Sequence, residues 1–593
     1  MTALKSHARD YRLLSNQFFR LLPYQVLMLV INAANIIIDS VFASNSIGKA
    51  AMSAIGFYSP LDHFLYAVSI TLVSGSQLLV GKSMGKNHLD SLQSIFSTDL
   101  IVSAVVSCCL SVLMVLASVT GLAGLFVEDA AELAAVNDYF MGMAPGIPAL
   151  ILGQQLFSFL SMENQTRRTT AASIACIALN TGMDLLLVSV LKAGTFGLGL
   201  ASSVAEWTFF GVMAWFYFSG KSDIRFSRKT FRKKTAFAII RQGYSGALSR
   251  FVEMFRCFVV NLLLIRYVAS LGLSVFAAVN SVMAVFWPVP FGMMAVTRMM
   301  LGVSLGEEDR KSVSDIMRIG ILRGGLLQVC ITAFIILMAV PFSSLFWSAG
   351  DPAFEMTVTG FRIIPLCMPL SVFSLLFACY AQATDNKFLK IVLPVVDGAA
   401  GVVLFSLLLI PGMGMTGLWI ANILNGLLCL TLIVSYAISK NRRAVRSLED
   451  LLVFPENFGV PENDRMDIEI RQLSEVMSIS GQVVDFCLQR GVDKRRAIYA
   501  GLAMEEMAGN IVSHGFAADK KSHCVNIRVV RKEDDIILRL RDDCIPFNPS
   551  ERMRIIDNPE DPCGNIGLRI VYGLARDVRY QFLLGLNVLT VVM

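Results

Sequence analysis

Two groups of side chains in this chain have types and spacings that suggest chemistry. The stretch "AMEEMAGNIVSHGF" (503–516) places Glu506 and Asn510 four residues apart, on one face of a polar helix. This Glu-x-x-x-Asn spacing is typical of a helix that binds a nucleotide. Far upstream, Asp39 and Asp184 are acids within long apolar stretches. The sequence therefore holds two candidate sites in very different surroundings.

The surroundings of the upstream acids indicate a membrane protein. The 593 residues are 55% hydrophobic and only 16% charged, and a membrane-spanning helix needs about 20 mainly apolar residues. By that measure we expect about twelve transmembrane helices, centred near residues 30, 68, 108, 149, 180, 208, 258, 284, 329, 367, 399 and 426. The net charge of +6 comes from short loops between these spans, so no nucleic-acid partner is expected. The 12 cysteines show no zinc-ligand spacing.

Charge in the loops predicts the orientation of the chain. Basic residues recur in alternate loops, as in "KSDIRFSRKTFRKK" (221–234), and follow the last span in "KNRRAVR" (440–446). The opposite loops carry little positive charge beyond Lys49 and Lys192. Since positive loops mark the cytoplasmic side, we expect a multi-pass protein of the cell membrane with both termini in the cytoplasm.

The apolar part of the chain repeats itself. "GTFGLGLA" (194–201) recurs as "GMTGLWIA" (414–421), and "SMGKNHLDSLQSI" (83–95) is echoed by "SLGEEDRKSVSDI" (304–316). Such parallel repeats predict two six-helix halves with a binding cavity between or within them. We place the halves at residues 12–219 and 235–440.

The whole body resembles the multidrug and toxic compound extrusion (MATE) family. The resemblance is carried in order by "IIIDSVFASNSIGKAAMSAIGFYSP", "GSQLLVGKSMGKNHLDS" and "ALNTGMDLLLVSVLKAGTFGLGLASS". It implies a secondary transporter that exports drugs or other small organic molecules, often cations, in exchange for H⁺ or Na⁺.

Depth in the membrane predicts a coupling site. Counting at 1.5 Å per residue places Asp39 in the first helix and Asp184 in the fifth at a similar depth. Asn180 lies one turn from Asp184, and Ser202 enters from the sixth helix at a comparable level. Two acids with amide and hydroxyl groups could bind H⁺ or Na⁺, and the MATE resemblance implies the same role for these four residues. The alternative is that Asp39 only marks the membrane edge.

Three further acids lie within apolar helices. Glu253 has an arginine three residues to either side, which favours a structural ion pair. Glu206 lies one turn beyond Ser202 and could face the same cavity. Asp397 is isolated in the second half, where its role stays open.

After a linker at 441–462, residues 463–593 alternate as an α/β domain with a closing hairpin. This tail resembles the Bergerat-type (GHKL) ATPases, and more narrowly the anti-sigma-factor serine kinases. The ordered set is "EEMAGN", "HGF", "RDDCIPFNP", "CGNIGLRIV" and "GLNVLT". The resemblance implies binding of ATP and Mg²⁺, with Glu506 as general base and Asn510 as the Mg²⁺ ligand.

The same resemblance implies four further nucleotide contacts. Asp542 would accept a hydrogen bond from the adenine amino group, and Thr590 would back the adenine pocket. Gly564 and Gly567 would let the backbone approach the phosphates at a helix N-terminus. The chain departs from the family where Asp-x-Gly is replaced by Asp542-Asp543-Cys544 and where the glycine-rich loop is reduced to "GNIG".

Three functions fit these features. The first is a cation-coupled exporter with a regulatory or kinase-like ATP-binding tail, because no P-loop motif for an ATP-driven pump occurs in the chain. The second is a membrane-bound sensor whose tail phosphorylates a serine on a partner like an anti-sigma-factor antagonist. The third is a flippase for lipid-linked molecules, for which a larger polar cavity would be expected.

Overall fold

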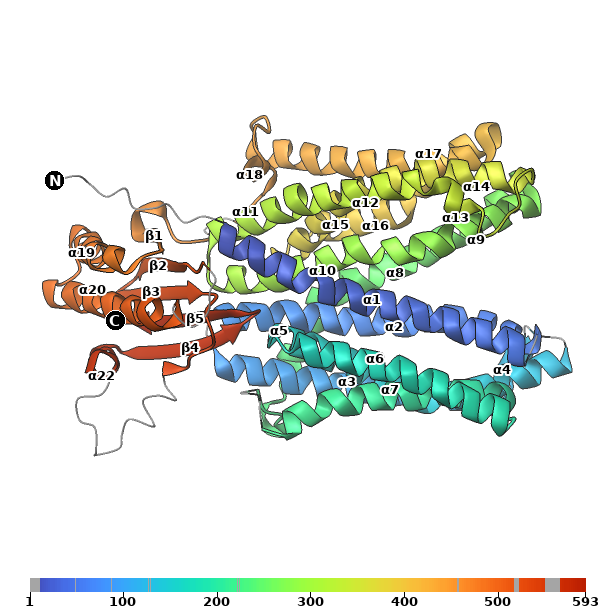
Figure 1. Ribbon diagram of the computed structural model, residues 1–593, viewed down its shortest axis with the longest axis horizontal. Helices are drawn as coiled ribbons and strands as arrows, with labels where there is room; N and C mark the ends of the chain where they lie inside the picture. Colours follow the sequence, from blue (N-terminus) through green and yellow to red (C-terminus); the bar gives the residue numbers. More distant parts are fainter. Residues whose placement is uncertain are drawn as a thin grey trace.

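The computed structural model describes residues 11–593 apart from 48, 87, 126, 128, 221, 223, 456–457, 517–521 and 550–565. Long helices form a body, and a sheet with its own helices lies at one end of this body (Figure 1). We call that sheet domain the tail and the adjoining end of the body the tail end. The architecture is therefore the predicted one: a polytopic helical body with a separate α/β domain.

The first half of the body contains six membrane-length helical segments. Short 3₁₀ (Ala144–Gly146) and π-helical (Leu185–Val190) turns extend two of its helices. Its helices are α1 (Arg12–Ser46), α2 (Lys49–Gly85), α3 (Leu89–Val119), α4 (Ala130–Met143), α5 (Ile147–Met162), α6 (Thr166–Asp184) and α7 (Gly194–Phe218).

The second half repeats this plan. Turns at Ile319–Gly324, Ile364–Leu366 and Val396–Ala400 join neighbouring helices, and α17 contains a break at Gly414, whose φ is 56°. The helices are α8 (Lys233–Tyr267), α9 (Ala269–Phe286), α10 (Pro288–Gly306), α11 (Arg310–Arg318), α12 (Gly325–Leu337), α13 (Ala339–Ser343), α14 (Pro352–Ile363), α15 (Cys367–Ala383), α16 (Leu389–Val395) and α17 (Gly401–Asn441).

The outer surface of the body has the character of a lipid-facing surface. Among the described residues, nine helical stretches are long and apolar enough to cross a membrane, and the one at Leu389–Asn441 spans 53 residues across the break at Gly414. Within Leu89–Val119, the most apolar 18-residue window has a mean hydropathy of 2.7. Only 17% of that window is buried within the protein. Apolar side chains that do not pack inward must be solvated by lipid.

The two halves touch through two pairs of glycines, one of which, Gly85 and Gly306, occupies equivalent positions in the repeat at 83–95 and 304–316. A Cβ on Gly81 would lie 2.9 Å from the Cα of Gly302, and a Cβ on Gly85 would lie 2.9 Å from the Cα of Gly306. Small residues allow such close approach of helices in membranes. Both pairs join α2 to α10 near the tail, and toward the far end the halves diverge (Figure 1).

The tail is a five-stranded antiparallel sheet in the order β1-β2-β3-β5-β4. The segment between body and sheet contains one short helix, α18 (Leu448–Leu451). The strands are β1 (Arg465–Ile470), β2 (Val525–Lys532), β3 (Asp535–Asp542), β4 (Asp577–Leu583) and β5 (Leu586–Val592), and the helices are α19 (Leu473–Gln489), α20 (Lys494–Asn510) and α22 (Ile566–Leu574).

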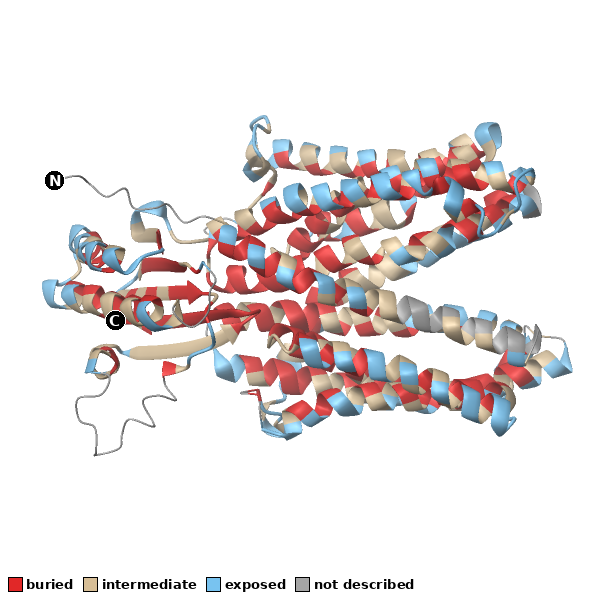
Figure 2. Cartoon of the chain, in the orientation of Figure 1, coloured by how far each residue is buried: buried red, intermediate tan, exposed pale blue. Residues whose placement is uncertain are grey.

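Both faces of this sheet are covered. Alternate side chains such as Ile527, Leu538 and Leu540 pack with residues of α19 and α20 in one apolar core. The intervening positions of β2 and β5 are buried as well, although no helix of the tail lies there, and Figure 2 shows these strands as continuous buried ribbons. Because successive strand residues point to opposite faces, the second face must pack against the body.

Candidate cation and nucleotide sites

The predicted coupling residues of the first half meet at one place. The Asn180 amide donates a hydrogen bond of 2.5 Å to Oδ1 of Asp39, and the Ser202 hydroxyl lies 3.5 Å from Oδ2 of the same carboxyl. Three helices, α1, α6 and α7, supply these groups. The structure therefore brings Asp39 into a polar cluster between helices.

Asp184 completes this cluster. Its side chain is fully buried and its carboxyl interacts with that of Asp39, while neither of its oxygens receives a hydrogen bond from the described N–H or hydroxyl groups. The α-helix gives way to a π-helical turn directly after Asp184, a local change often found at functional sites. Two carboxyls this close to each other favour a shared proton or a bound cation, because their charges repel when both are ionised.

Asp39 and Ser202 of this cluster line a cavity of about 250 Å³ within the first half. Glu206 lines this cavity, as expected, and Asp62 on α2 adds an acid that sequence reasoning missed. Aromatic rings complete the lining, with the rings of Tyr58 and Tyr139 packed edge to face at 5.4 Å. Acids and tyrosines around an otherwise apolar space suit an organic cation.

The acids of the second half are paired. Asp397 accepts hydrogen bonds from Ser374 (2.7 Å) and from the amide of Asn425 (3.1 Å). Glu253 forms the expected ion pairs with Arg250 (3.1 Å) and Arg256 (3.5 Å). These contacts are sufficient to explain both acids structurally.

In the tail, Asp542 ends β3 on the face covered by helices. Its carboxyl accepts hydrogen bonds from the Asn587 amide (2.6 Å) and from the Cys544 backbone N–H (3.0 Å). Burial raises the pKa of Asp542 above its usual range, and these hydrogen bonds oppose that rise. The arrangement leaves a buried, oriented acceptor of the kind that an adenine amino group needs.

The replacement of the family's glycine by Cys544 is accommodated by a second glycine. A Cβ on Gly515 would lie 3.0 Å from the Cys544 sulfur, so the thiol occupies the space that Gly515 leaves open. The intervening Asp543 accepts a hydrogen bond of 2.8 Å from His523 when the histidine carries its proton on Nδ1. With Cys544 at this position, the Asp542 carboxyl still accepts the two hydrogen bonds described above.

The phosphate side of the site contains the expected pair from α20. Glu506 lies against Gly567 at the start of α22, where a Cβ would come 1.8 Å from the Glu506 carboxyl oxygen. A larger residue at position 567 would have to displace the Glu506 carboxyl, which agrees with the close approach expected there. Asn510 is the last residue of α20, one turn beyond Glu506. Gly564 lies outside the described residues.

Thr590 does not have the predicted position. It lies three residues from Asn587 on β5 and therefore on the opposite face of the sheet, where its hydroxyl is 3.4 Å from Arg539 Nε. Asn587, which pairs with Asp542 across the strands, lies beside the Asp542 carboxyl instead. The prediction for Thr590 is therefore wrong, because residues three positions apart on a strand point to opposite faces of the sheet.

Comparison with known families agrees with the body's geometry. The model of the MatE family matches residues 24–186 and 247–393, which together make up more than half of the chain. The chain belongs to the MatE family. Its tail, residues 469–593, matches the histidine kinase-like ATPase domain.

Individual relatives of this MatE protein are distant in sequence and close in fold. It is 21% identical over 351 residues to the probable multidrug resistance protein NorM of Photorhabdus laumondii, covering 58% of this chain and 75% of that protein. A multidrug resistance MATE transporter solved in an outward-facing conformation superposes with a TM-score of 0.66 at 17% identity, covering 70% of this chain and 94% of the other.

A transporter of the MOP superfamily from Pyrococcus furiosus gives the same TM-score of 0.66 at 17% identity. The match covers 72% of this chain and 97% of that one. That transporter is described as having a binding pocket of reversed polarity.

Proposed function

We propose that this MatE protein is a cation-coupled exporter of small organic cations and that its tail regulates transport by binding ATP and Mg²⁺. Asp39 carries this proposal: it lines an acidic cavity that also contains tyrosines, and its carboxyl meets that of the buried Asp184. The cavity volume of about 250 Å³ suits a small molecule better than a lipid-linked cargo.

Competition for negative charge would couple the two fluxes. When the carboxyls of Asp39, Asp62 and Glu206 are ionised, the cavity attracts an organic cation, and the tyrosine rings add cation–π attraction. Binding of H⁺ or Na⁺ at Asp39 and Asp184 neutralises part of that negative charge and lowers the affinity of the cavity for the organic cation. A ligand shifts the transporter only by this difference in affinity between its states.

The tail would serve control rather than drive transport. Glu506 and Asn510 would hold Mg²⁺ and the attacking group, with Asp542 and Asn587 at the adenine. The chain contains a single such domain and no P-loop motif. In the proposed orientation, with basic loops in the cytoplasm, the tail meets cytoplasmic ATP at the inner membrane surface.

Reconstituted vesicles allow a direct test. We expect uptake of a fluorescent organic cation such as ethidium to follow an imposed H⁺ or Na⁺ gradient. Asp184→Asn, which keeps the shape and removes the charge, should reduce transport to the level of empty vesicles. Glu506→Ala should only change the rate.

Two results would contradict the proposal. One is transport driven by ATP after every ion gradient has been collapsed. The other is an equal loss of transport in Asp184→Asn and Glu506→Ala, since a regulatory tail and a coupling site must differ in this respect.

A further inference from the structure

The face of the tail sheet that turns away from its helices carries a set of arginines. Arg528 on β2 pairs across the strands with Arg539 on β3, and Arg541 follows two residues later on the same face. We call these three residues the arginine face. Alternation along β3 separates them from Leu538, Leu540 and Asp542, which point toward the helices and the nucleotide site.

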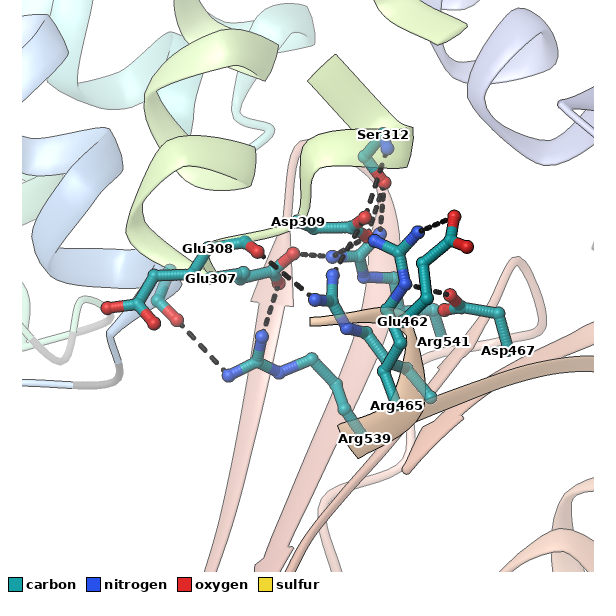
Figure 3. Close-up of polar contacts among 11 residues, drawn as sticks. Glu307, Glu308, Asp309, Ser312, Glu462, Arg465, Asp467, Arg539 and Arg541 are labelled. Atoms are coloured by element: carbon teal, nitrogen blue, oxygen red, sulfur yellow. Dashed lines mark hydrogen bonds and ion pairs between the residues drawn. The ribbon is translucent and has the colours of Figure 1, made fainter. Parts of the chain in front are cut away.

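The arginine face meets an acidic turn of the second half of the body. This turn, Glu307–Asp309, joins α10 to α11. Arg528 forms an ion pair of 2.7 Å with Asp309, and Arg541 forms another with Glu307. Figure 3 shows Arg539 and Arg541 of the sheet directed toward Glu307 and Asp309 of the turn.

These ion pairs are buried. Glu307 retains 7% of its surface and Asp309 none, while the Arg528 and Arg541 side chains are 4% and 8% exposed. Charges removed from water need partners, and losing one partner leaves the other uncompensated. The acidic turn therefore depends on the tail for its charge balance.

The same sheet also contacts the first half. Arg539 donates a hydrogen bond of 3.3 Å to the carbonyl of Gly85 at the end of α2. The β4–β5 turn reaches α1 and α5, where Gln17 donates to the Leu584 carbonyl (3.2 Å) and the Leu584 N–H lies 3.4 Å from the carbonyl of Met162. Leu584 is 1% exposed, and the space left between these groups is only about 20 Å³.

We propose that the docked sheet is a clamp that joins the two halves at the tail end. The sheet contacts Gly85, Gln17 and Met162 in the first half and the acidic turn in the second half. While both sets of contacts hold, the halves cannot separate at the tail end. Opening of a passage between the halves at the tail end then requires release of the acidic turn by the arginine face. This proposal rests on the proposed function only for its consequence in transport.

Distance measurements on the full-length protein test the clamp. Spin labels can be introduced on unnatural residues at positions Asp90 and Lys387, which are exposed in the first and second halves. The distance between the two labels reports how far the halves are separated at the tail end. We expect Arg541→Ala and Glu307→Gln each to add a population at longer distance. Arg531→Ala, on β2 but on the opposite face, is the matched control and should leave the distribution unchanged.

Exchanging the two charges distinguishes loss of the ion pair from misfolding of the variant. Arg541→Glu alone should open the tail end, and Arg541→Glu combined with Glu307→Arg should restore the short distance. Unchanged distances in Arg541→Ala and Glu307→Gln, or an exchange that fails to restore them, would overturn the clamp. The measurement needs neither cargo nor ion gradient, so a failure of the exporter proposal would leave it interpretable. If both hold, Arg541→Ala also raises the initial transport rate.

Discussion

The two halves of the body share one plan but treat their buried acids differently. In the second half, Asp397 is held by Ser374 and Asn425, and its charge has the donors it needs. In the first half, Asp184 faces Asp39 with no described N–H or hydroxyl group to satisfy it. Asp39 also has donors, from Asn180 and Ser202. The fold is the same in both halves, so what distinguishes the first-half site is a second buried carboxyl, Asp184, which lacks donors of its own among the described residues and lies against Asp39; such a pair is suited to exchange a cation.

The comparison would fail if Asp397, the hydrogen-bonded acid of the second half, proved as necessary for coupling as Asp39. We predict that Asp39→Asn reduces gradient-driven transport to background, because an amide cannot take up H⁺ or balance Na⁺. Asp397→Asn should retain transport and lower stability by about 1–3 kcal/mol, since it weakens charge-assisted hydrogen bonds. Vesicle uptake and thermal unfolding of the same preparations measure the two effects.

A result in which Asp397→Asn abolishes uptake without loss of stability would place a coupling site in the second half as well. Asp351→Asn, an acid that caps α14 outside the cavity, is a suitable control for the general effect of removing a carboxylate.

A smaller effect is expected from the acid that only attracts cargo. Glu206 lines the cavity, but no described hydrogen bond joins it to the Asp39 cluster. Glu206→Gln should raise the KM for an organic cation about tenfold, equivalent to about 1.4 kcal/mol of lost attraction, and change the maximal rate much less. Glu355→Gln, exposed on α14, should leave both values unchanged. A fall in maximal rate alone would assign Glu206 to coupling instead.

Much of the site in the first half could be predicted from sequence because helical spacing and membrane depth are regular. Asp39, Asn180 and Ser202 meet as expected. Asp62 was missed, although Tyr58, Asp62 and Tyr66 recur every four residues and so share one face of α2. Counting this spacing would have found it.

Other features depend on contacts that no local pattern contains. The acidic turn was visible in "SLGEED", and the arginines in "NIRVVR" and "LRLRDD", but about 220 residues separate them. Only the packed structure shows that a sheet face with alternating arginines is an interface rather than a solvated surface. Alternation also explains the error at Thr590, since moving three residues along a strand changes the face.

The smallest predicted effect extends the comparison to the tail, where Asp542 resembles Asp397 in having its donors. Asn587→Ala removes one of them and should weaken ATP binding by about 1 kcal/mol, or about fivefold, whereas Thr590→Val should leave it unchanged.

Burial already raises the pKa of Asp542, and the hydrogen bond from Asn587 lowers it, so the pKa of Asp542 in Asn587→Ala must be higher still. Because the ionised carboxyl is the better acceptor for the adenine amino group, ATP affinity should fall as the pH is lowered, and in Asn587→Ala this fall should begin at a higher pH. Titration of the full-length protein with a fluorescent ATP analogue across pH measures both shifts. Equal weakening by Thr590→Val would instead mean that nucleotide binding depends on the docked face of the sheet, since that hydroxyl lies beside Arg539.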